Sequence, residues 1–374
     1  MKTKIILAAG FAAAQVGAAH AGGIDRSGQG ISPLFEKGTY GEVTLGFADP
    51  NVSGTATASY GGAKSGNMAG SYMLPGFAFK RDFGNKVSAA LIYDQPFGAK
   101  VNYPAATSLP AYFAAGATAT LSTNALTGLV RYKIDDNFSV YGGARWQTMR
   151  EKVGSLPLNT TTAYSAQGAN KGAFGYVVGV AYEKPEIALR VALTYNSKIS
   201  YSVPTREYLN GALSGSSTTQ IDTPQSINLD AQTGINPTTL VFGSIRWVDW
   251  KNFAIAPQLY KSLTKGGSLV SYHDNTITYT LGVGHKFSDQ WSGAVSVSYE
   301  PKVGGFASNL GPTDGKASIG LGATYTVNPN VKITAGVSYI QIGSAQTTLN
   351  NTSAASNFSG NHAVAAGVKV GFTF

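Results

Sequence analysis

The sequence has no cysteine and little charge. Only 13% of its 374 residues are Asp, Glu, Lys or Arg, whereas soluble domains usually carry about 25%. The missing cysteines exclude a disulfide framework, a thiolate metal site and a cysteine nucleophile. Outside the first 21 residues, no run of about 18 apolar residues could cross a bilayer as a helix. These absences exclude a helical membrane protein and argue against an ordinary soluble enzyme.

The first 21 residues have the pattern of a secretory signal peptide. Lys2 and Lys4 precede a short Ala-rich apolar stretch, and Ala19-His20-Ala21 supplies a small-x-small cleavage site. The stretch is too short for a membrane anchor. We therefore predict that the protein is exported.

The remaining sequence alternates between apolar and polar residues with a period of two. From Ile187 to Val203 the odd positions are mostly aliphatic or tyrosine, and the even positions are small or polar. This 17-residue run exceeds the 9–11 residues that a tilted strand needs to cross a bilayer. Aromatic residues near strand ends match the interfacial girdles of membrane barrels. Continuing the same alternation places seven cations inside the barrel: Arg131, Arg145, Arg190, Lys198, Arg246, Lys332 and Lys369.

Fourteen such segments are separated by alternating short turns and long Gly/Ser/Thr/Asn-rich loops, which is the pattern of bacterial outer-membrane barrels. Twelve or sixteen strands were the alternatives, because alternation is poor in 219–235. We predict an all-β transmembrane antiparallel barrel of 14 strands over residues 39–374, preceded by a short hatch segment over 22–38. The expected strands are 39–53, 67–80, 86–103, 118–133, 138–151, 171–183, 187–203, 219–235, 239–250, 275–287, 291–300, 315–327, 331–341 and 361–374.

Several short segments, taken in order, resemble the FadL/TodX family of outer-membrane transporters. They are Asp25-Arg26-Ser27-Gly28-Gln29-Gly30, Pro50-Asn51-Val52-Ser53-Gly54, Tyr93-Asp94-Gln95-Pro96-Phe97-Gly98, Arg246-Trp247-Val248-Asp249-Trp250, and Tyr279 to Tyr299 with its Asp289-Gln290-Trp291 turn. The C-terminal Phe374 resembles the signal that directs such barrels to the outer membrane. The resemblance implies a monomeric barrel with an N-terminal plug, in the bacterial outer membrane and in contact with its lipid. The family's Asn-Pro-Ala plug motif is absent here, which puts the gating role of this shorter segment in question.

In this family, ligands leave through a gap at a kinked third strand. The corresponding residues here are Asp94, Gln95, Pro96, Phe97 and Gly98. Pro96 cannot donate a ladder hydrogen bond and Gly98 has no side chain to pack, so strand pairing is expected to break. An ordinary bulge is the alternative.

Two arginines and six apolar residues are the candidate ligand contacts. The resemblance assigns a carboxylate contact to Arg150, and Arg145 is a second candidate inside the barrel, where a solvated lumen is the simpler interpretation. An outer apolar groove is expected from Leu109, Tyr112, Phe113, Val153, Leu156 and Leu158, with loop-on-loop packing as the alternative.

The sequence thus favours passive uptake of long-chain fatty acids or other hydrophobic small molecules. A water-filled, weakly anion-selective porin is the main alternative, followed by a surface adhesin and a Ser/His phospholipase on the barrel wall. The four histidines (His20, His273, His285 and His362) are too scattered to indicate a metal site, so we expect neither a metal nor a cofactor. Positive charge is spread over the strands, which argues against nucleic acid as a partner.

Overall fold

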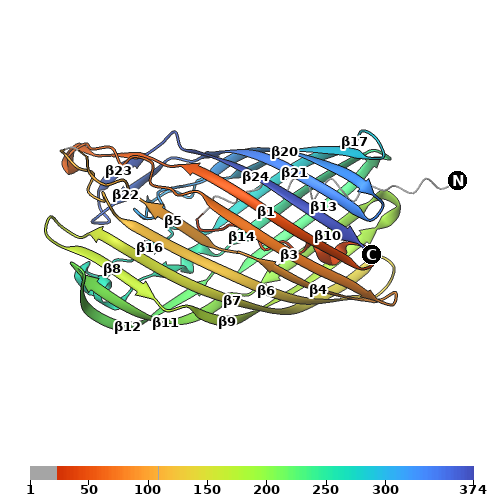
Figure 1. The fold of residues 1–374 in the computed structure, drawn as a ribbon, viewed down its shortest axis with the longest axis horizontal. Helices are drawn as coiled ribbons and strands as arrows, with labels where there is room; N and C mark the ends of the chain where they lie inside the picture. Colours follow the sequence, from red (N-terminus) through yellow and green to blue (C-terminus); the bar gives the residue numbers. More distant parts are fainter. Residues whose placement is uncertain (1–22, 108) are drawn as a thin grey trace.

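A computed structural model describes residues 23–374 except residue 108. The expected signal peptide lies outside the described residues. The chain forms a closed antiparallel barrel of fourteen strands (Figure 1). The first strand, β1 (Tyr40–Asn51), pairs with the last, β24 (His362–Thr373), and also with β3 (Tyr72–Phe83), so the main sheet has no free edge. Both the fold class and the strand number predicted from the sequence are confirmed.

Four of the fourteen strands are interrupted and are therefore divided into two segments each. The barrel segments between β3 and β24 are β4 (Val87–Asp94) with β5 (Gly98–Asn102), β6 (Thr118–Lys133), β7 (Phe138–Pro157), β8 (Ala163–Gly168) with β9 (Lys171–Lys184), β10 (Leu189–Asn196) with β11 (Ile199–Leu209), β12 (Ala212–Thr223) with β13 (Ser226–Asn236), β14 (Thr239–Val248), β17 (Thr276–Lys286), β18 (Trp291–Glu300), β20 (Lys316–Asn328) and β21 (Val331–Ile342).

The long loops contain small elements of their own. Two minor sheets join β15 (Ala254–Ile255) with β16 (Val270–Ser271), and β19 (Phe306–Ala307) with β22 (Ala345–Thr348), β23 (Ala354–Phe358) and β2 (Gly54–Ala56). The helical turns are η1 (Ser32–Phe35), η2 (Ala58–Tyr60), η3 (Pro185–Ile187), η4 (Trp250–Asn252) and α2 (Gln258–Leu263). In the part of the chain that the structure describes, no helix is long and apolar enough to cross a membrane.

The outer wall of the barrel carries an apolar band, and the inner wall is small and polar. On β20 and β21, for example, Leu321 and Val337 are exposed on the outside, while Thr324 and Thr334 are buried and share a hydrogen bond of 2.9 Å. Large aromatic side chains lie on the outer wall toward both ends of the strands, among them Phe47, Phe83, Phe138, Trp146, Phe174, Phe287, Trp291 and Tyr299. This is the distribution expected of a barrel in a bilayer.

The predicted continuous strand over 187–203 is wrong in one respect: the two faces exchange at Asn196–Ser197. In β10, Leu193 points outward and Thr194 inward, whereas in β11 Tyr201 is buried inside and its polar neighbours face outward. Lys198, expected inside, is 62% exposed and forms an ion pair of 3.1 Å with Asp222. The segments also change partners, because β10 pairs with β9 and β13, while β11 pairs with β8 and β12.

The exchange of faces has a physical reason. β8, β11 and β12 project from one end of the barrel (Figure 1), and the outward residues of β11 and β12 are polar. A wall whose outside meets water is stable with a polar outside and an apolar inside, which is the reverse of a wall in lipid. The barrel therefore has a membrane-crossing part and an extension that turns apolar residues such as Ile199, Tyr201 and Val203 inward.

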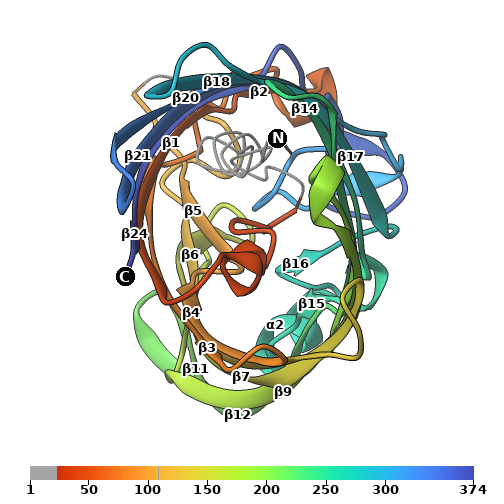
Figure 2. The same ribbon diagram turned by 90° about the vertical axis from the view of Figure 1, so that its right-hand side faces the viewer.

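The N-terminal segment lies inside the ring of strands (Figure 2). Its 3-10 turn η1 begins with Ser32-Pro33, where proline suits a first turn, and buries Leu34 completely. Leu34 belongs to an apolar cluster with Ile31 and with Ala78, Ile92 and Leu129 of the barrel wall. The segment is thus packed against β3, β4 and β6.

Candidate functional site

A groove of about 860 Å³ opens among the long loops at one end of the barrel. Four of the six residues expected to form an outer groove line it: Tyr112, Phe113, Leu156 and Leu158. Tyr112 is fixed by a hydrogen bond of 2.9 Å to Ser356 and by stacking against Phe113 at 4.4 Å. These contacts hold aromatic and aliphatic side chains along the groove.

The other two residues of that set lie elsewhere. Leu109 is 90% exposed and is not part of the groove lining. Val153 lines a second, smaller cavity of about 40 Å³. Leu269 and Leu310, which sequence reasoning did not single out, line both the groove and the small cavity. The two spaces therefore adjoin each other at these two side chains.

The small cavity is almost entirely apolar and leads to the N-terminal segment. Its lining includes Ile24 of that segment, Leu121 of β6 and Phe253 of the loop after β14. Ile24 in turn accepts a backbone hydrogen bond of 2.8 Å from Gly98. The groove and the small cavity therefore adjoin each other, and the small cavity lies next to the third strand.

Pairing along the third strand breaks where Pro96 lies. The ladder between β3 and β4 ends at the pair Phe77–Tyr93, and β5 pairs with β6 but not with β3. Pro75 of β3 lies just beyond the last pair, so both sides of the interruption contain a residue without a backbone N–H. Pro75 is the second sequence signal for this break.

The N-terminal segment fills the inner side of this interruption. The backbone N–H of Arg26 donates to the Pro96 carbonyl at 2.8 Å, and Asp25 forms a β-bridge with Phe97. The Arg26 guanidinium stacks on the Tyr72 ring at 4.0 Å, in space that a Cβ on Gly98 would occupy, 2.5 Å from Cζ. A side chain at position 98 would therefore have to displace the Arg26 guanidinium.

A cavity of about 170 Å³ lies in the barrel wall beside the interruption. Ser27 and Asp94, which hydrogen-bond to each other, line it from the interior. Leu45, Phe47 and Phe77, whose side chains are exposed on the outer wall, also line it. The lining of the cavity thus includes residues of the interior and residues of strands whose side chains face outward.

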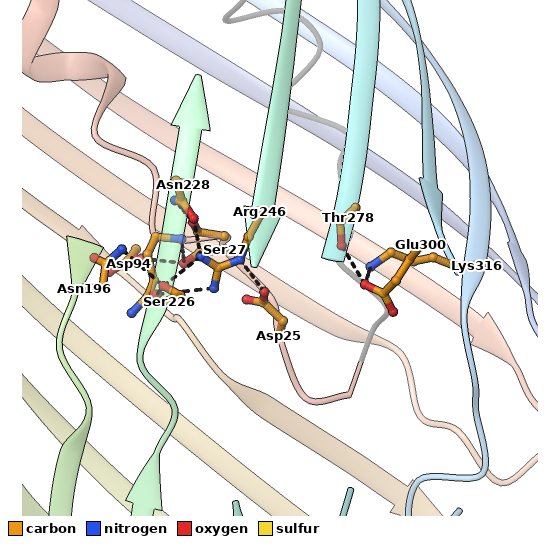
Figure 3. A network of polar contacts seen from close by, with 12 residues as sticks. Asp25, Ser27, Asp94, Asn196, Ser226, Asn228, Arg246, Thr278, Glu300 and Lys316 are labelled. Atoms are coloured by element: carbon orange, nitrogen blue, oxygen red, sulfur yellow. Dashed lines mark hydrogen bonds and ion pairs between the residues drawn. The ribbon is translucent and has the colours of Figure 1, made fainter. Parts of the chain in front are cut away.

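A polar network fastens the N-terminal segment to the opposite side of the barrel (Figure 3). Arg246 of β14 donates to Asp25 Oδ2 at 2.7 Å and to Asn228 Oδ1 at 2.7 Å. Gln29 Oε1 accepts from Ser226 at 2.8 Å and from Arg246 at 3.2 Å. Glu300, Lys316 and Thr278 form a separate polar group nearby, with Thr278 donating to Glu300 at 2.6 Å.

The two arginines considered for ligand binding lie on opposite faces of β7. Arg145 is buried inside, where Nε donates to Thr127 Oγ1 at 2.9 Å and Nη1 to Asn196 Oδ1 at 3.0 Å. Arg150 is exposed on the outer surface, and the inward residue beside it is Glu151. The sequence indicates this placement, because alternate residues of a strand share one face, and residues 145, 147, 149 and 151 therefore point inward together.

Glu151 is 6% exposed and lines the small apolar cavity. Its Oε1 is 3.5 Å from Thr205 Oγ1, and its Oε2 has no hydrogen-bond partner among the described residues. The nearby Glu207 is differently placed, since it accepts from the Tyr164 hydroxyl at 2.8 Å and from the backbone N–H groups of Leu259 and Tyr260.

Glu151 lies beyond the membrane-crossing part of its strand. The outward residues of β7 are apolar up to Trp146, and then Arg150 and Lys152 are exposed. Burial in the apolar surroundings raises the pKa of Glu151 to about 7; the Thr205 hydrogen bond opposes this shift and the charge of Glu207 adds to it. Within residues 23–107 and 109–374, no His/Asp/Glu group is arranged to hold a metal ion.

These features define a β-barrel with a groove among its loops, a small apolar cavity below it and a further cavity at a break in its wall. Residues 35–374 match the family model of the outer membrane protein transport proteins (OMPP1/FadL/TodX), and the chain belongs to this family. Proteins of this family are transporters of hydrophobic compounds in the outer membrane. A comparison of the sequence with curated proteins finds no match.

Solved structures show the same fold at low sequence identity. A FadL homologue of Pseudomonas aeruginosa superimposes with a TM-score of 0.75 at 16% identity, covering 97% of this chain and 98% of that one. The toluene transporter TodX of P. putida gives a TM-score of 0.63 at 12% identity, covering 96% and 99%. A monoaromatic hydrocarbon channel, CymD, gives 0.62 at 12% identity, covering 96% and 99%.

Proposed function

We propose that this protein is a passive channel for hydrophobic compounds, long-chain fatty acids or others, which leave sideways through the wall at residues 94–98. One observation carries the proposal: a groove lined in part by aromatic and aliphatic side chains and a small apolar cavity share Leu269 and Leu310, and the cavity lies next to a break in strand pairing. A cavity at that break has both interior and outer-wall residues in its lining. Such a path lets an apolar molecule enter lipid without crossing the polar lumen.

Burial of apolar surface supplies the affinity for the groove. Each methylene group removed from water contributes about 0.8 kcal/mol, so an alkyl chain or aromatic ring is held without a charged contact. Arg145 remains a candidate contact for a fatty-acid carboxylate, although Thr127 and Asn196 already accept two of its hydrogen bonds. Arg150 would need to leave the outer surface to take that role.

Residues 23–38 act as the plug in this proposal. Their contacts with Arg246, Asn228 and the third strand support a closed lumen. A water-filled porin requires an open lumen, so conductance in planar bilayers separates the two functions. A large, steady open conductance of the wild-type protein would favour the porin.

The direct test is uptake by cells that lack their own outer-membrane transporter of hydrophobic compounds. Labelled oleate and labelled toluene are supplied separately to cells with the intact protein, with residues 94–98 deleted, or with the exposed hairpin residues 211–213 deleted as a control. We expect uptake with the intact protein and the control deletion, and its loss when 94–98 is removed at equal surface level. Uptake that survives the deletion of 94–98 would argue against the lateral exit, and no uptake of either compound would argue against the channel.

A further inference from the structure

The inner side of β7 presents a buried carboxyl group at the end of the apolar path. Glu151 lines the small cavity together with Ile24, Leu121 and Phe253 and has one oxygen without a hydrogen-bond partner among the described residues. A buried polar atom that is left unpaired costs free energy, so a group retained in this state is suited to bind something else. The neighbouring carboxyl group of Glu207, by contrast, is engaged by Tyr164 and by backbone N–H groups.

The surroundings of Glu151 leave space for this side chain and add no positive charge. Gly168 of β8 lies so close that a Cβ there would be 2.6 Å from Glu151 Cγ. In the part of the chain that the structure describes, neither Glu151 nor Glu207 takes part in an ion pair. The titratable and polar groups that face Glu151 are Glu207 and Thr205 of β11 and Tyr164 of β8. A ligand with a negative charge would therefore meet two carboxyl groups and no compensating cation.

We propose that Glu151 recognises the polar end of the ligand and selects hydrophobic molecules that carry a hydroxyl group over those that carry a carboxylate. A hydroxyl group both donates and accepts, so it bonds to Glu151 whether that carboxyl is ionised or protonated. The cavity of about 40 Å³ accommodates a group of this size, while the apolar remainder of the ligand extends past Leu269 and Leu310 into the groove. This inference rests on the proposed channel function and assigns its substrate class.

Protonation of Glu151 adds a dependence on pH to the selection. With a pKa of about 7, the carboxyl is mostly ionised at about pH 8 and mostly protonated at about pH 5.5. Rejection of a carboxylate ligand is therefore stronger at the higher pH. Binding of a phenol, which is uncharged at both values, changes much less.

The test measures binding of three matched probes to the full-length protein in lipid nanodiscs, with empty nanodiscs as background. The probes are 4-propylphenol, propylbenzene and 4-propylbenzoate, which differ only in the polar end. We expect the wild type to prefer the phenol to the hydrocarbon by about tenfold, as one hydrogen bond to a charged group would give. Benzoate binding should be weakest at about pH 8 and should strengthen toward about pH 5.5.

Two substitutions at the same position separate recognition from packing. Glu151→Gln should retain the preference for the phenol, because an amide also donates and accepts, but lose the pH dependence of benzoate binding. Glu151→Leu should reduce the ratio of phenol to hydrocarbon affinity to about one. Asp222→Asn, which removes an exposed carboxylate on the outside of the same extension, is the matched control and should behave as wild type. The unfolding temperature of each variant shows that the barrel is intact.

The outcomes are distinguishable from failure of the channel function. The role of Glu151 is overturned if propylbenzene binds saturably and the phenol is not preferred, or if Glu151→Leu keeps the preference of the wild type. In either case the proposed channel function still stands. Benzoate binding as strong as phenol binding at about pH 8 overturns the selection in the same way. No saturable binding of any probe overturns both proposals.

Discussion

The ion pair between Asp25 and Arg246 should hold the N-terminal plug in place, and its removal should open the channel. Both side chains are 7% exposed, and Asp25 Oδ2 accepts from Arg246 Nε at 2.7 Å. Asp25→Ala removes the carboxylate and leaves the guanidinium inside the barrel. Asn228, Ser226 and Gln29 remain as its hydrogen-bond acceptors.

The size of the effect follows from what the plug loses. Breaking a buried ion pair by removing one partner typically costs about 3–5 kcal/mol. Because Arg246 keeps three neutral acceptors, the lower end of that range applies, and about 3 kcal/mol corresponds to roughly a 150-fold shift of the closed-to-open equilibrium. Two backbone hydrogen bonds to the third strand and the buried Leu34 remain, so the plug should open often without leaving permanently.

Single-channel recording in planar bilayers measures this shift as the frequency of opening at a fixed voltage. The exposed pair of Lys198 and Asp222 provides the matched control, since surface ion pairs contribute about 0–1 kcal/mol. Asp222→Ala should therefore leave the opening frequency unchanged. The double variant Asp25→Ala/Arg246→Met removes both charges and should return the frequency toward that of wild type, because an apolar replacement leaves no unpaired cation.

An opening frequency of Asp25→Ala within about twofold of wild type would refute this reasoning. It would mean that the apolar and backbone contacts of the plug suffice to hold it. If the double variant opens as often as Asp25→Ala, the segment is held by the ion pair itself, and the unpaired arginine is not the cause of the opening.

Three further predictions follow from single side chains. Gly98→Val should displace the Arg26 guanidinium from the third strand and raise the opening frequency in the same bilayer recordings, since even a Cβ would lie 2.5 Å from Arg26 Cζ. Gln147→Leu should raise the barrel's free energy of unfolding by about 1–3 kcal/mol, measured by denaturant titration, because neither side-chain amide atom of this fully buried glutamine has a partner among the described residues. Glu151 has a folded-state pKa of about 7, above its ordinary value, so its contribution to stability is complete below about pH 4.5 and is lost as pH rises through 7. The wild type should therefore lose about 3 kcal/mol of stability over this interval in addition to any loss seen in Glu151→Gln, and parallel pH profiles of the two proteins would contradict the assignment.

The sequence was sufficient for the number of strands because the two signals behind it are physical constraints of a bilayer. Alternation marks the lipid-facing wall, and turns on one side are short while loops on the other are long. Both signals weaken beyond the membrane, and there the predicted boundaries were least accurate. The stretch 204–218 was expected to be a loop, yet β11 continues to Leu209 and β12 begins at Ala212. Its serines and threonines form a wall whose outside faces water, so a polar composition does not exclude a strand.

Part of the candidate site could be predicted from the sequence. Tyr112, Phe113, Leu156 and Leu158 could be placed near a groove because exposed apolar residues in a loop are unusual. The place of Leu269 and Leu310 between the groove and the small cavity could not be predicted, since nothing in a single sequence says which of many loop leucines line the same space. Glu151 could have been found by counting along β7 from Arg145, because the parity that puts Arg145 inside puts Arg150 outside.

The exchange of faces at Asn196–Ser197 links the fold to the proposed transport. A barrel that stayed polar inside along its whole length would offer an apolar ligand only a wet lumen, and the ligand would gain nothing by entering. Once the wall leaves the membrane, its apolar residues have no lipid to face, and turning them inward buries them in the interior of the extension. Ile199, Tyr201 and Val203 are nearly completely buried for this reason. The same inversion sets β11 opposite Glu151 in largely apolar surroundings, so the affinity we propose for apolar molecules and the selection we assign to this carboxyl group have a common structural origin.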